Sequence, residues 1–402
     1  METSTSGILM TMSGARGTYR TGRERVARIL DAAHELFVAN GYRATSLRDI
    51  ARASGISHPA LARHYPTKHE ILTDLVQRLE TRDGEWMTAQ SAPASPADTA
   101  RKNDATPGWV ELFTALLGEA TSPEHPAHEL MKLRRRLGLR LFDDYFAILP
   151  GGPRSRHLEA IRFGATWDGL QILSLYFPSE IDIPAHLTAY EEYLRTAGIP
   201  PAPPAGGRNS APAPAGCDSD PSPRLHALRC AAQLYASRGY YEASMQAVAD
   251  AARITKAALI HIAPTKHALL DLVLTEVVAA PGSPGTDPGS WFHDLPARPR
   301  WRTAAEVVLM CEAITPTHPA HEFMRNRLAE ARQAAQRDIT DEGGPDEDGG
   351  HAADRLLALS LGILISWLYD PDDIDPRTAI EGGITGFPGA SLRRAEPASK
   401  AE

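Results

Sequence analysis

The sequence predicts an all-α protein made of two tandem copies of one helical unit. Three observations support this fold class: apolar residues recur at helical spacing, no run of alternating β-branched residues is present, and the chain repeats itself. The helical spacing is clearest just before Asn40-Gly41, a pair typical of a helix end. The apolar set there consists of Val26, Ile29, Leu30, Ala33, Leu36 and Phe37.

The internal repeat extends through most of the 402 residues. At an offset of 198, PTKH at 66–69 matches PTKH at 264–267, and Gly41-Tyr42 matches Gly239-Tyr240. At an offset of 193, HPAHE at 125–129 matches HPAHE at 318–322. Two collinear blocks of this kind indicate a duplication, with roughly 180 residues in each copy, which is an ordinary domain size.

Composition excludes several classes of protein. A hydrophobic share of 43% and a charged share of 23% are typical of a soluble globular protein, and no run of about 18 apolar residues is present. The N-terminus lacks the features of a secretory signal, and three widely spaced cysteines fit a reducing compartment. We therefore expect a cytoplasmic protein without membrane contact. The net charge of -8 argues against a protein that coats nucleic acid everywhere, but it allows a local basic face.

Breaks in the apolar pattern set the expected domain order. The most visible break is the Pro/Ala/Gly-rich stretch 198–223, and others fall at 91–107, 281–299 and 341–350. We name the smaller part of each copy its head and the larger part its body. The expected order is a flexible tail (1–17), first head (18–70), first body (71–198), linker (199–223), second head (224–268), second body (269–387) and tail (388–402).

Residues 45–69, TSLRDIARASGISHPALARHYPTKH, predict two short helices joined by a tight turn. Thr45 is the expected N-cap of a helix over 46–53, and Gly55 can take the positive φ that the turn needs. Ser57 is expected to cap the next helix, whose first turn accommodates Pro59. The shared apolar seam consists of Leu47, Ile50, Ala51, Ile56, Leu61 and Tyr65. This pattern predicts a helix-turn-helix, in which the second helix enters the DNA major groove; a plain helical hairpin is the alternative.

The order of these motifs resembles the TetR family. The resemblance rests on Asn-Gly-Tyr after the first helix, Thr-Ser-Leu-Arg-Asp-Ile-Ala, Gly-Ile-Ser and Leu-x-x-His-Tyr-Pro-Thr-Lys, with weaker likeness in both bodies. It implies that Thr45 and Lys68 contact phosphates. It also implies a groove face that consists of Ser57, His58, Pro59, Ala62, Arg63 and His64. Hydroxyls and lysines bind phosphate, whereas imidazole and guanidinium groups can donate to guanine.

The first head departs from the family pattern at Ala62, where the family usually has a tyrosine that contacts the DNA backbone. Some affinity must therefore come from other residues. The candidates are Arg48 and the basic stretch that consists of Arg16, Arg20, Arg23 and Arg25; a solvated face is the alternative for that stretch.

The second head has diverged. Ala243 replaces the expected cap, Arg253 replaces the turn glycine, and Ala263 replaces Tyr65. Its weaker candidate DNA contacts are Thr255, Lys256, His261 and Lys266. Net charge does not separate the heads: residues 18–76 hold nine Lys/Arg against six Asp/Glu, and 222–274 hold six against three, so both are +3. The second head either binds a degenerate half-site or is a structural pseudo-subunit, and we favour the latter.

Other polar and aromatic groups favour structural roles. We interpret His125, His128 and Glu129, which recur as His318, His321 and Glu322, as helix-start and core residues rather than metal ligands. Arg134, Arg135 and Arg136 are expected on a solvated face with one inward contact. Aromatic side chains are expected to pack where the bodies pair: Trp167, Tyr176, Phe177, Trp367 and Tyr369. No motif supports catalysis, a metal or a cofactor.

The resemblance implies a transcriptional regulator that binds operator DNA and a small-molecule effector, with repression as the expected outcome. Subunits of the family pair through their last helices, here 153–177 with 184–196 and 352–368 with 375–384, so one fused chain could form a pseudo-dimer; higher oligomers stay open. The alternative is a small-molecule sensor or protein-interaction module whose second helix-turn-helix no longer binds DNA.

Overall fold

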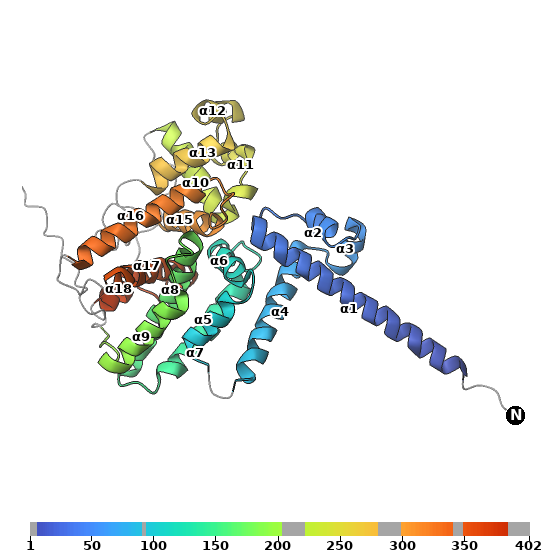
Figure 1. Cartoon of the computed structure of the whole chain (residues 1–402). Coiled ribbons are helices and arrows are strands. Elements are labelled where there is room, and N and C mark those ends of the chain that lie inside the picture. Colours follow the sequence, from blue (N-terminus) through green and yellow to red (C-terminus); the bar gives the residue numbers. More distant parts are fainter. Residues whose placement is uncertain (1–5, 91–93, 203–221, 280–298, 341–348, 385–402) are drawn as a thin grey trace, which may run out of the picture. The chain divides into compact units, whose positions relative to one another are not determined.

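The computed structural model describes residues 6–90, 94–202, 222–279, 299–340 and 349–384, and in these ranges every regular element is a helix (Figure 1). The all-α prediction is thus confirmed. The chain divides into two compact units, residues 1–93 and 94–402. The first unit contains α1 (Ser6–Asn40), α2 (Leu47–Ala53), α3 (His58–His64) and α4 (Lys68–Thr88).

The second unit holds the first body, the second head and the second body in chain order. The first body consists of α5 (Pro96–Asp104), α6 (Trp109–Glu119), α7 (His128–Phe146), α8 (Pro153–Tyr176) and α9 (Ile183–Ala197). The second head consists of α10 (Pro223–Glu242), α11 (Met245–Ala251), α12 (Lys256–Ile262), α13 (Lys266–Val273) and the π-helix η2 (Leu274–Val278). The second body consists of α15 (Arg300–Glu312), α16 (His321–Thr340), α17 (Gly349–Tyr369) and α18 (Pro376–Ile384).

The first unit is a small helical core around the predicted helix-turn-helix. Apolar side chains of α1, such as Ile29 and Phe37, are fully or almost fully buried, as are Leu72 and Leu75 of α4. α4 thus belongs to the same compact unit as the first head, beyond the boundary expected at residue 70. α1 begins at Ser6, within the range expected as a flexible tail (1–17), and residues 1–5 lie outside the described ranges.

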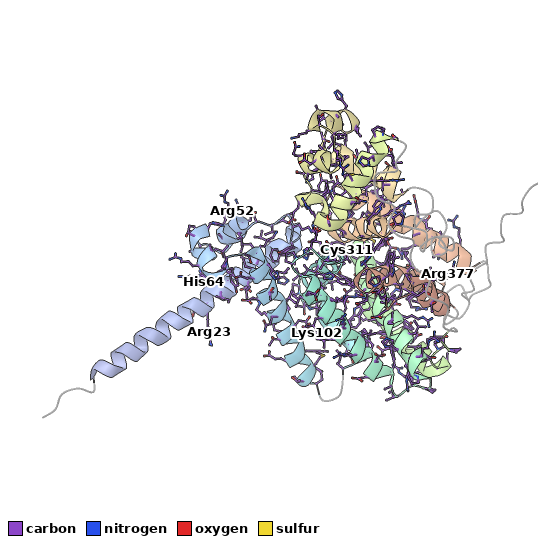
Figure 2. The ribbon with its side chains drawn as sticks, turned by 180° about the vertical axis from the view of Figure 1, so that it is seen from behind. Arg23, Arg52, His64, Lys102, Cys311 and Arg377 are labelled. Carbon is purple, nitrogen blue, oxygen red and sulfur yellow. The ribbon has the colours of Figure 1, made fainter. Side chains whose placement is uncertain are left out.

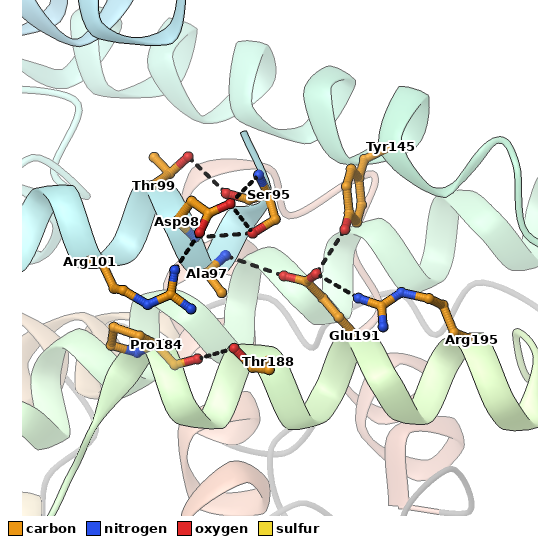
Figure 3. A network of polar contacts seen from close by, with 10 residues as sticks. All are labelled: Ser95, Ala97, Asp98, Thr99, Arg101, Tyr145, Pro184, Thr188, Glu191 and Arg195. Atoms are coloured by element: carbon orange, nitrogen blue, oxygen red, sulfur yellow. Dashed lines mark hydrogen bonds and ion pairs between the residues drawn. The ribbon is translucent and has the colours of Figure 1, made fainter. Parts of the chain in front are cut away.

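The first body contains a helix where the sequence predicted a break at 91–107. Ser95 accepts a hydrogen bond from the Asp98 amide and Asp98 bonds back to Ser95, a capping box that starts α5 despite its polar composition. Glu191 of α9 then fastens α5 and α7 (Figure 3): its carboxylate accepts hydrogen bonds from the Ala97 amide at 3.2 Å and the Tyr145 hydroxyl at 2.7 Å. Apolar periodicity misses this helix because caps and distant partners stabilise it.

The two bodies pack through α8 and α17, which cross at glycines (Figure 1). A Cβ at Gly169 would overlap the Ala358 carbonyl, and a Cβ at Gly362 would overlap the Ala165 carbonyl. Both pairs are related by the offset of 193, so equivalent residues of the two copies exchange roles at the crossing. The absence of a side chain lets the two backbones approach closely.

Aromatic contacts across the bodies are also reciprocal. The Tyr176 hydroxyl donates to the Met310 carbonyl at 2.7 Å, and the Tyr369 hydroxyl donates to the equivalent Leu117 carbonyl at 3.1 Å. The ring of Tyr176 stacks on His321, and that of Tyr369 stacks on His128. Four of the five predicted interface aromatics are buried, and Trp367 is half-buried.

Ion pairs break this symmetry. Arg135 binds Asp168 and also the Ser366 hydroxyl of the second body, whereas the equivalents of Arg135 and Asp168 are Leu328 and Leu361. The expectation that only one arginine of 134–136 turns inward is wrong. The Arg134 guanidinium lies 4.3 Å from the ring centroid of Phe113, and Arg136 pairs with Asp370 at 3.5 Å. Each arginine has its own partner because a helix directs successive side chains differently.

A buried arginine joins the last helices of the two bodies. Arg162 of α8 is fully buried; it pairs with Glu159 at 3.0 Å and donates from Nε to the Ala379 carbonyl of α18 at 2.8 Å. The Tyr190 hydroxyl of α9 donates to the other oxygen of Glu159 at 2.6 Å. These bonds compensate the desolvation of both charges and link three helices.

Among the described helices, the stretch His351–Tyr369 of α17 is apolar and long enough to cross a bilayer, a feature that the sequence-based expectation did not identify. Its 94% burial inside the protein is that of a core helix. Most of the expected linker (203–221), the segments 281–298 and 341–348, and the C-terminal tail lie outside the described ranges.

Candidate nucleic-acid interface

The helix-turn-helix of the first head forms as two capped helices around a glycine turn. Ser46, not Thr45, caps α2, in a capping box with Asp49 whose side chain pairs with Arg52 at 2.6 Å. The hydrogen bonds from the Ser46 hydroxyl and amide lower the pKa of the Asp49 carboxyl. Gly55 adopts φ 69°, and Ser57 accepts from the Ala60 amide at the start of α3, so the predicted turn and second cap are confirmed.

The outer face of α3 is polar and open to solvent. Ser57, His58, Pro59 and Arg63 are exposed, while Ala62 and His64 are half-buried; Arg48 of α2 is also exposed. Arg52 projects outward from the same unit, which also carries His64 (Figure 2).

Inward-facing side chains fix α3 on the opposite face. Leu61 is fully buried, and the buried Tyr65 donates its hydroxyl to Asp74 of α4 at 2.8 Å. Burial and this carboxylate together raise the pKa of Tyr65 well above its usual value. In the predicted seam, Leu47 and Ile56 are half-buried and the other members are buried. α3 is therefore held on one side and presents its polar side outward.

Two expected phosphate contacts point into the protein. Thr45 is only 3% exposed, and its hydroxyl donates to the carbonyls of Leu36 at 3.2 Å and Gly41 at 2.9 Å. The Lys68 ammonium donates to carbonyls between α1 and α2 rather than extending from the surface. Of the α1 arginines, Arg23 is exposed and Arg25 is half-buried, and the side chains of Arg16 and Arg20 are outside the described part.

The second head keeps the helix-turn-helix but carries a different outer face. Ser244 caps α11, so the change at Ala243 removes no cap; the expectation is corrected because the cap lies one residue later. Arg253 occupies the turn at φ 55°. On α12, Thr255, Lys256 and His261 are exposed, beside Ile260, whose exposure of 43% leaves an apolar group in solvent.

A buried polar cluster joins the second head to its own body. Glu312 of α15 accepts a hydrogen bond from the Tyr240 amide at 2.8 Å. The ring of His318 lies edge-on to Tyr240 and Tyr241, with centroids 5.2 Å and 5.4 Å apart. Burial, together with His321 and Lys266, lowers the pKa of His318 to about 4, so the ring is neutral at neutral pH, although Glu119 opposes this shift. The sequence signal for this cluster was the repeated HPAHE motif, whose partners could not be assigned.

The repeated histidines serve as structural residues. His128 Nδ1 lies 2.8 Å from the Ala120 carbonyl and His321 Nδ1 lies 2.7 Å from the Ala313 carbonyl, so each Nδ1–H donates across a helix boundary. Both rings are buried, in agreement with the predicted core role. In the described ranges, no three His, Cys, Asp or Glu side chains are arranged to hold a metal ion.

Comparisons with known proteins identify the same two segments. Residues 29–75 and 227–273 match the model of the family described as bacterial regulatory proteins, tetR family. The chain is 29% identical over 188 residues to the HTH-type transcriptional regulator BetI of Rhizobium meliloti, a match that covers 44% of this chain and 91% of BetI.

Shorter matches fall on other regulators. The chain is 40% identical over 79 residues to the HTH-type transcriptional repressor Rv3405c of Mycobacterium tuberculosis, covering 19% of this chain and 40% of that repressor. It is 38% identical over 63 residues to the HTH-type transcriptional activator FasR of Mycolicibacterium smegmatis, covering 16% and 29% of the two chains.

Both family matches coincide with the helix-turn-helix heads, so the predicted tandem repeat is confirmed. The relatives are transcriptional regulators rather than enzymes, as the sequence indicated. The chain therefore belongs to the TetR family of DNA-binding transcriptional regulators.

Proposed function

We propose that this regulator is a ligand-responsive repressor that works in the cytoplasm as a single-chain pseudo-dimer, with its first head making the base contacts. The observation that carries this proposal is the difference between the two recognition helices. α3 exposes His58 and Arg63, whereas α12 has Lys256 and His261 at these positions and exposes Ile260 in place of Ala62. Imidazole and guanidinium groups can donate to guanine in the major groove, but isoleucine can contact only the methyl group of thymine.

The DNA contacts that we propose in the first head are on its solvent-exposed polar side. Ser57, at the N-terminus of α3, and Arg48 on α2 are suited to phosphate, while His58, Arg63 and His64 are suited to base edges. Pro59 and Ala62 present small surfaces that allow close approach. In the second head, Thr255 and Lys256 are suited to phosphate, and His261 is the exposed imidazole that remains for a base edge, so its contacts should discriminate less between bases.

Packing between the bodies supports the pseudo-dimer. The glycine crossing of α8 and α17 and the tyrosine hydrogen bonds are reciprocal, as in a symmetric pair of subunits. The ion pairs are not: Arg332 binds Glu180 of the first body and Asp354 of the second, both at 2.6 Å, and its equivalent is Leu139. Two first bodies would lack this pair because Leu139 replaces the arginine, so pairing within one chain is favoured over pairing between two first bodies.

Light scattering in dilute solution tests the pseudo-dimer. We expect a mass near that of one chain, 43.5 kDa. A two-chain particle that persists at the lowest measurable concentration would overturn the proposal and would indicate that two first heads act together.

Repression is the direction of regulation that the resemblance to the family implies. One relative is named a repressor and another an activator, so DNA binding by itself does not set the sign. Effector binding in a body would act by favouring one of two spacings between the heads. Selection of bound fragments from genomic DNA, followed by a promoter-reporter assay with and without the regulator, tests this. Lower expression with the regulator supports repression, and higher expression contradicts it.

A further inference from the structure

The ammonium group of Lys68 is surrounded by main-chain oxygens. Its Nζ donates to the carbonyls of Tyr42 at 2.7 Å, Thr45 at 2.9 Å and Arg43 at 3.3 Å. It also lies 4.3 Å from the centroid of the Tyr42 ring, within the range of a cation–π contact. A lysine ammonium has three N–H donors, and here all three have an acceptor inside the protein.

The position of these carbonyls gives the contact its mechanical role. Residues 42–45 form the turn that precedes α2, and Lys68 is the first residue of α4, which follows α3. One side chain therefore closes the helix-turn-helix at both ends. The Thr45 hydroxyl holds the same turn to the end of α1 through its bonds to Leu36 and Gly41. The tilt of α3 depends in part on this closure, because α2 and α3 are connected to the rest of the head through these two ends, their apolar seam and the hydrogen bond from Tyr65 to Asp74.

The same contact recurs in the second head. Lys266, the equivalent residue, donates to the Tyr241 carbonyl at 2.9 Å and lies 4.5 Å from the centroid of the Tyr240 ring. The outer face of that head carries different side chains, including the exposed Ile260, yet the lysine retains its place under the turn. A lysine that served mainly to bind phosphate would have no reason to donate to the carbonyls of the same turn in both heads.

We infer that Lys68 is a positioning residue that sets the orientation of the recognition helix, rather than a ligand of the DNA phosphates. The inference rests on the proposed binding of DNA through the first head. The two possible roles of Lys68 predict different losses of DNA affinity when the side chain is removed. Removal of a phosphate contact weakens binding to every sequence and lowers the salt dependence by about one ion. Removal of a positioning contact weakens mainly the sequence-specific complex, because only that complex needs base edges and side chains in register.

The test compares Lys68→Met and Lys68→Arg in the full-length chain. Arginine keeps the charge and binds phosphate, but its planar guanidinium cannot replace a compact ammonium among three carbonyls. Lys266→Met is the matched control in the other head, and Arg63→Gln is the control for the DNA face. Affinity is measured by fluorescence anisotropy on the selected operator and on an unrelated duplex over a series of salt concentrations, with thermal unfolding followed in parallel.

We expect both Lys68 variants to lose about tenfold in operator affinity, with an unchanged salt slope and little change on the unrelated duplex. Lys266→Met should leave both affinities near wild type. Operator binding by Lys68→Arg at the wild-type level, or an equal loss on both duplexes with a salt slope lower by about one, would overturn the inference.

Thr45→Val keeps the test decisive if the Lys68 variants do not fold. This variant loosens the same turn without removing a charge, so the ratio of operator to unrelated affinity should fall at an unchanged salt slope; an unchanged ratio would count against positioning. Failure of the proposed function gives a different result: Arg63→Gln would then have no effect, or the wild-type chain would not distinguish the two duplexes.

Discussion

In the first head the turn between α2 and α3 is made by Gly55 at φ 69°, whereas in the second head Arg253 holds the same turn at φ 55°. The scaffold around this turn is shared: Ser46 and Ser244 cap the first helices, and Ser57 and Thr255 cap the second. The outer faces differ. From α3 to α12, His58 becomes Lys256, Pro59 becomes Ala257, Ala62 becomes Ile260, Arg63 becomes His261 and His64 becomes Ile262.

Under the proposed function, the fold of a head and its ability to recognise bases depend on separate residues. Both heads share the helix caps, the buried leucines Leu61 and Leu259, and a lysine under the turn, and the second head keeps its fold with a strained residue in that turn. Base recognition depends on a few exposed side chains that contribute little to folding, so those can change without loss of structure. Equal net charge in the two heads therefore does not imply equal recognition.

The largest expected effect is a loss of folding stability in acid, caused by two buried histidines. His318 contacts that head and has a pKa lowered to about 4 by burial, and His186 on α9 has a pKa lowered to about 4 by burial, His351 and Arg355. An unfolded histidine titrates at 6.5, so between pH 6.5 and 4 the unfolded chain binds more protons and stability falls as the pH falls. Each histidine should remove about 2 kcal/mol between pH 7 and pH 5.

Urea unfolding at the two pH values measures this loss. His318→Gln should remove about half of the pH dependence that these two histidines cause. An unaltered pH dependence in His318→Gln would show that the histidine at this joint does not cause the acid sensitivity.

The next effect concerns DNA recognition. Arg63→Ala should weaken operator binding by about 1–3 kcal/mol, the value of a good bidentate contact with a base, while His261→Ala in the second head should change it by less than about 0.5 kcal/mol. Arg140→Ala, at an exposed position on α7, controls for the loss of one positive charge outside the heads. A larger loss in His261→Ala than in Arg63→Ala, measured by anisotropy, would reverse the roles of the heads.

The smallest effect concerns the turns. Arg253→Gly should raise the free energy of unfolding by about 1 kcal/mol because glycine has no Cβ penalty at positive φ, and Gly55→Ala should lower it by a similar amount. Arg253→Ala keeps the penalty and should therefore give no gain. Denaturant titration measures the free energy of unfolding of the three variants. Equal stability of Arg253→Gly and Arg253→Ala would mean that the turn of the second head carries no strain.

Local features of this protein could be predicted from sequence, and long-range ones could not. Apolar spacing and motif order predicted both helix-turn-helix heads and the last helices of both bodies, because spacing and caps are local signals. The start of α1 at Ser6 and the polar helix α5 were missed, since neither has a strong apolar pattern. The inward position of Lys68 could not be predicted either, because its three acceptors are more than twenty residues away in the chain.

A base-by-base mutation scan of the operator, combined with footprinting of the full chain, tests the asymmetry of the heads most directly. Dimeric helix-turn-helix proteins bind near-palindromes because two identical recognition helices are related by a two-fold axis. Here one chain presents α3 and α12, which differ at most outward positions. We predict a site without palindromic symmetry, in which one half shows strong base preferences and the other shows weak preferences or backbone protection alone. Two equally informative inverted half-sites would contradict this account and would indicate that two chains place their first heads on the same operator.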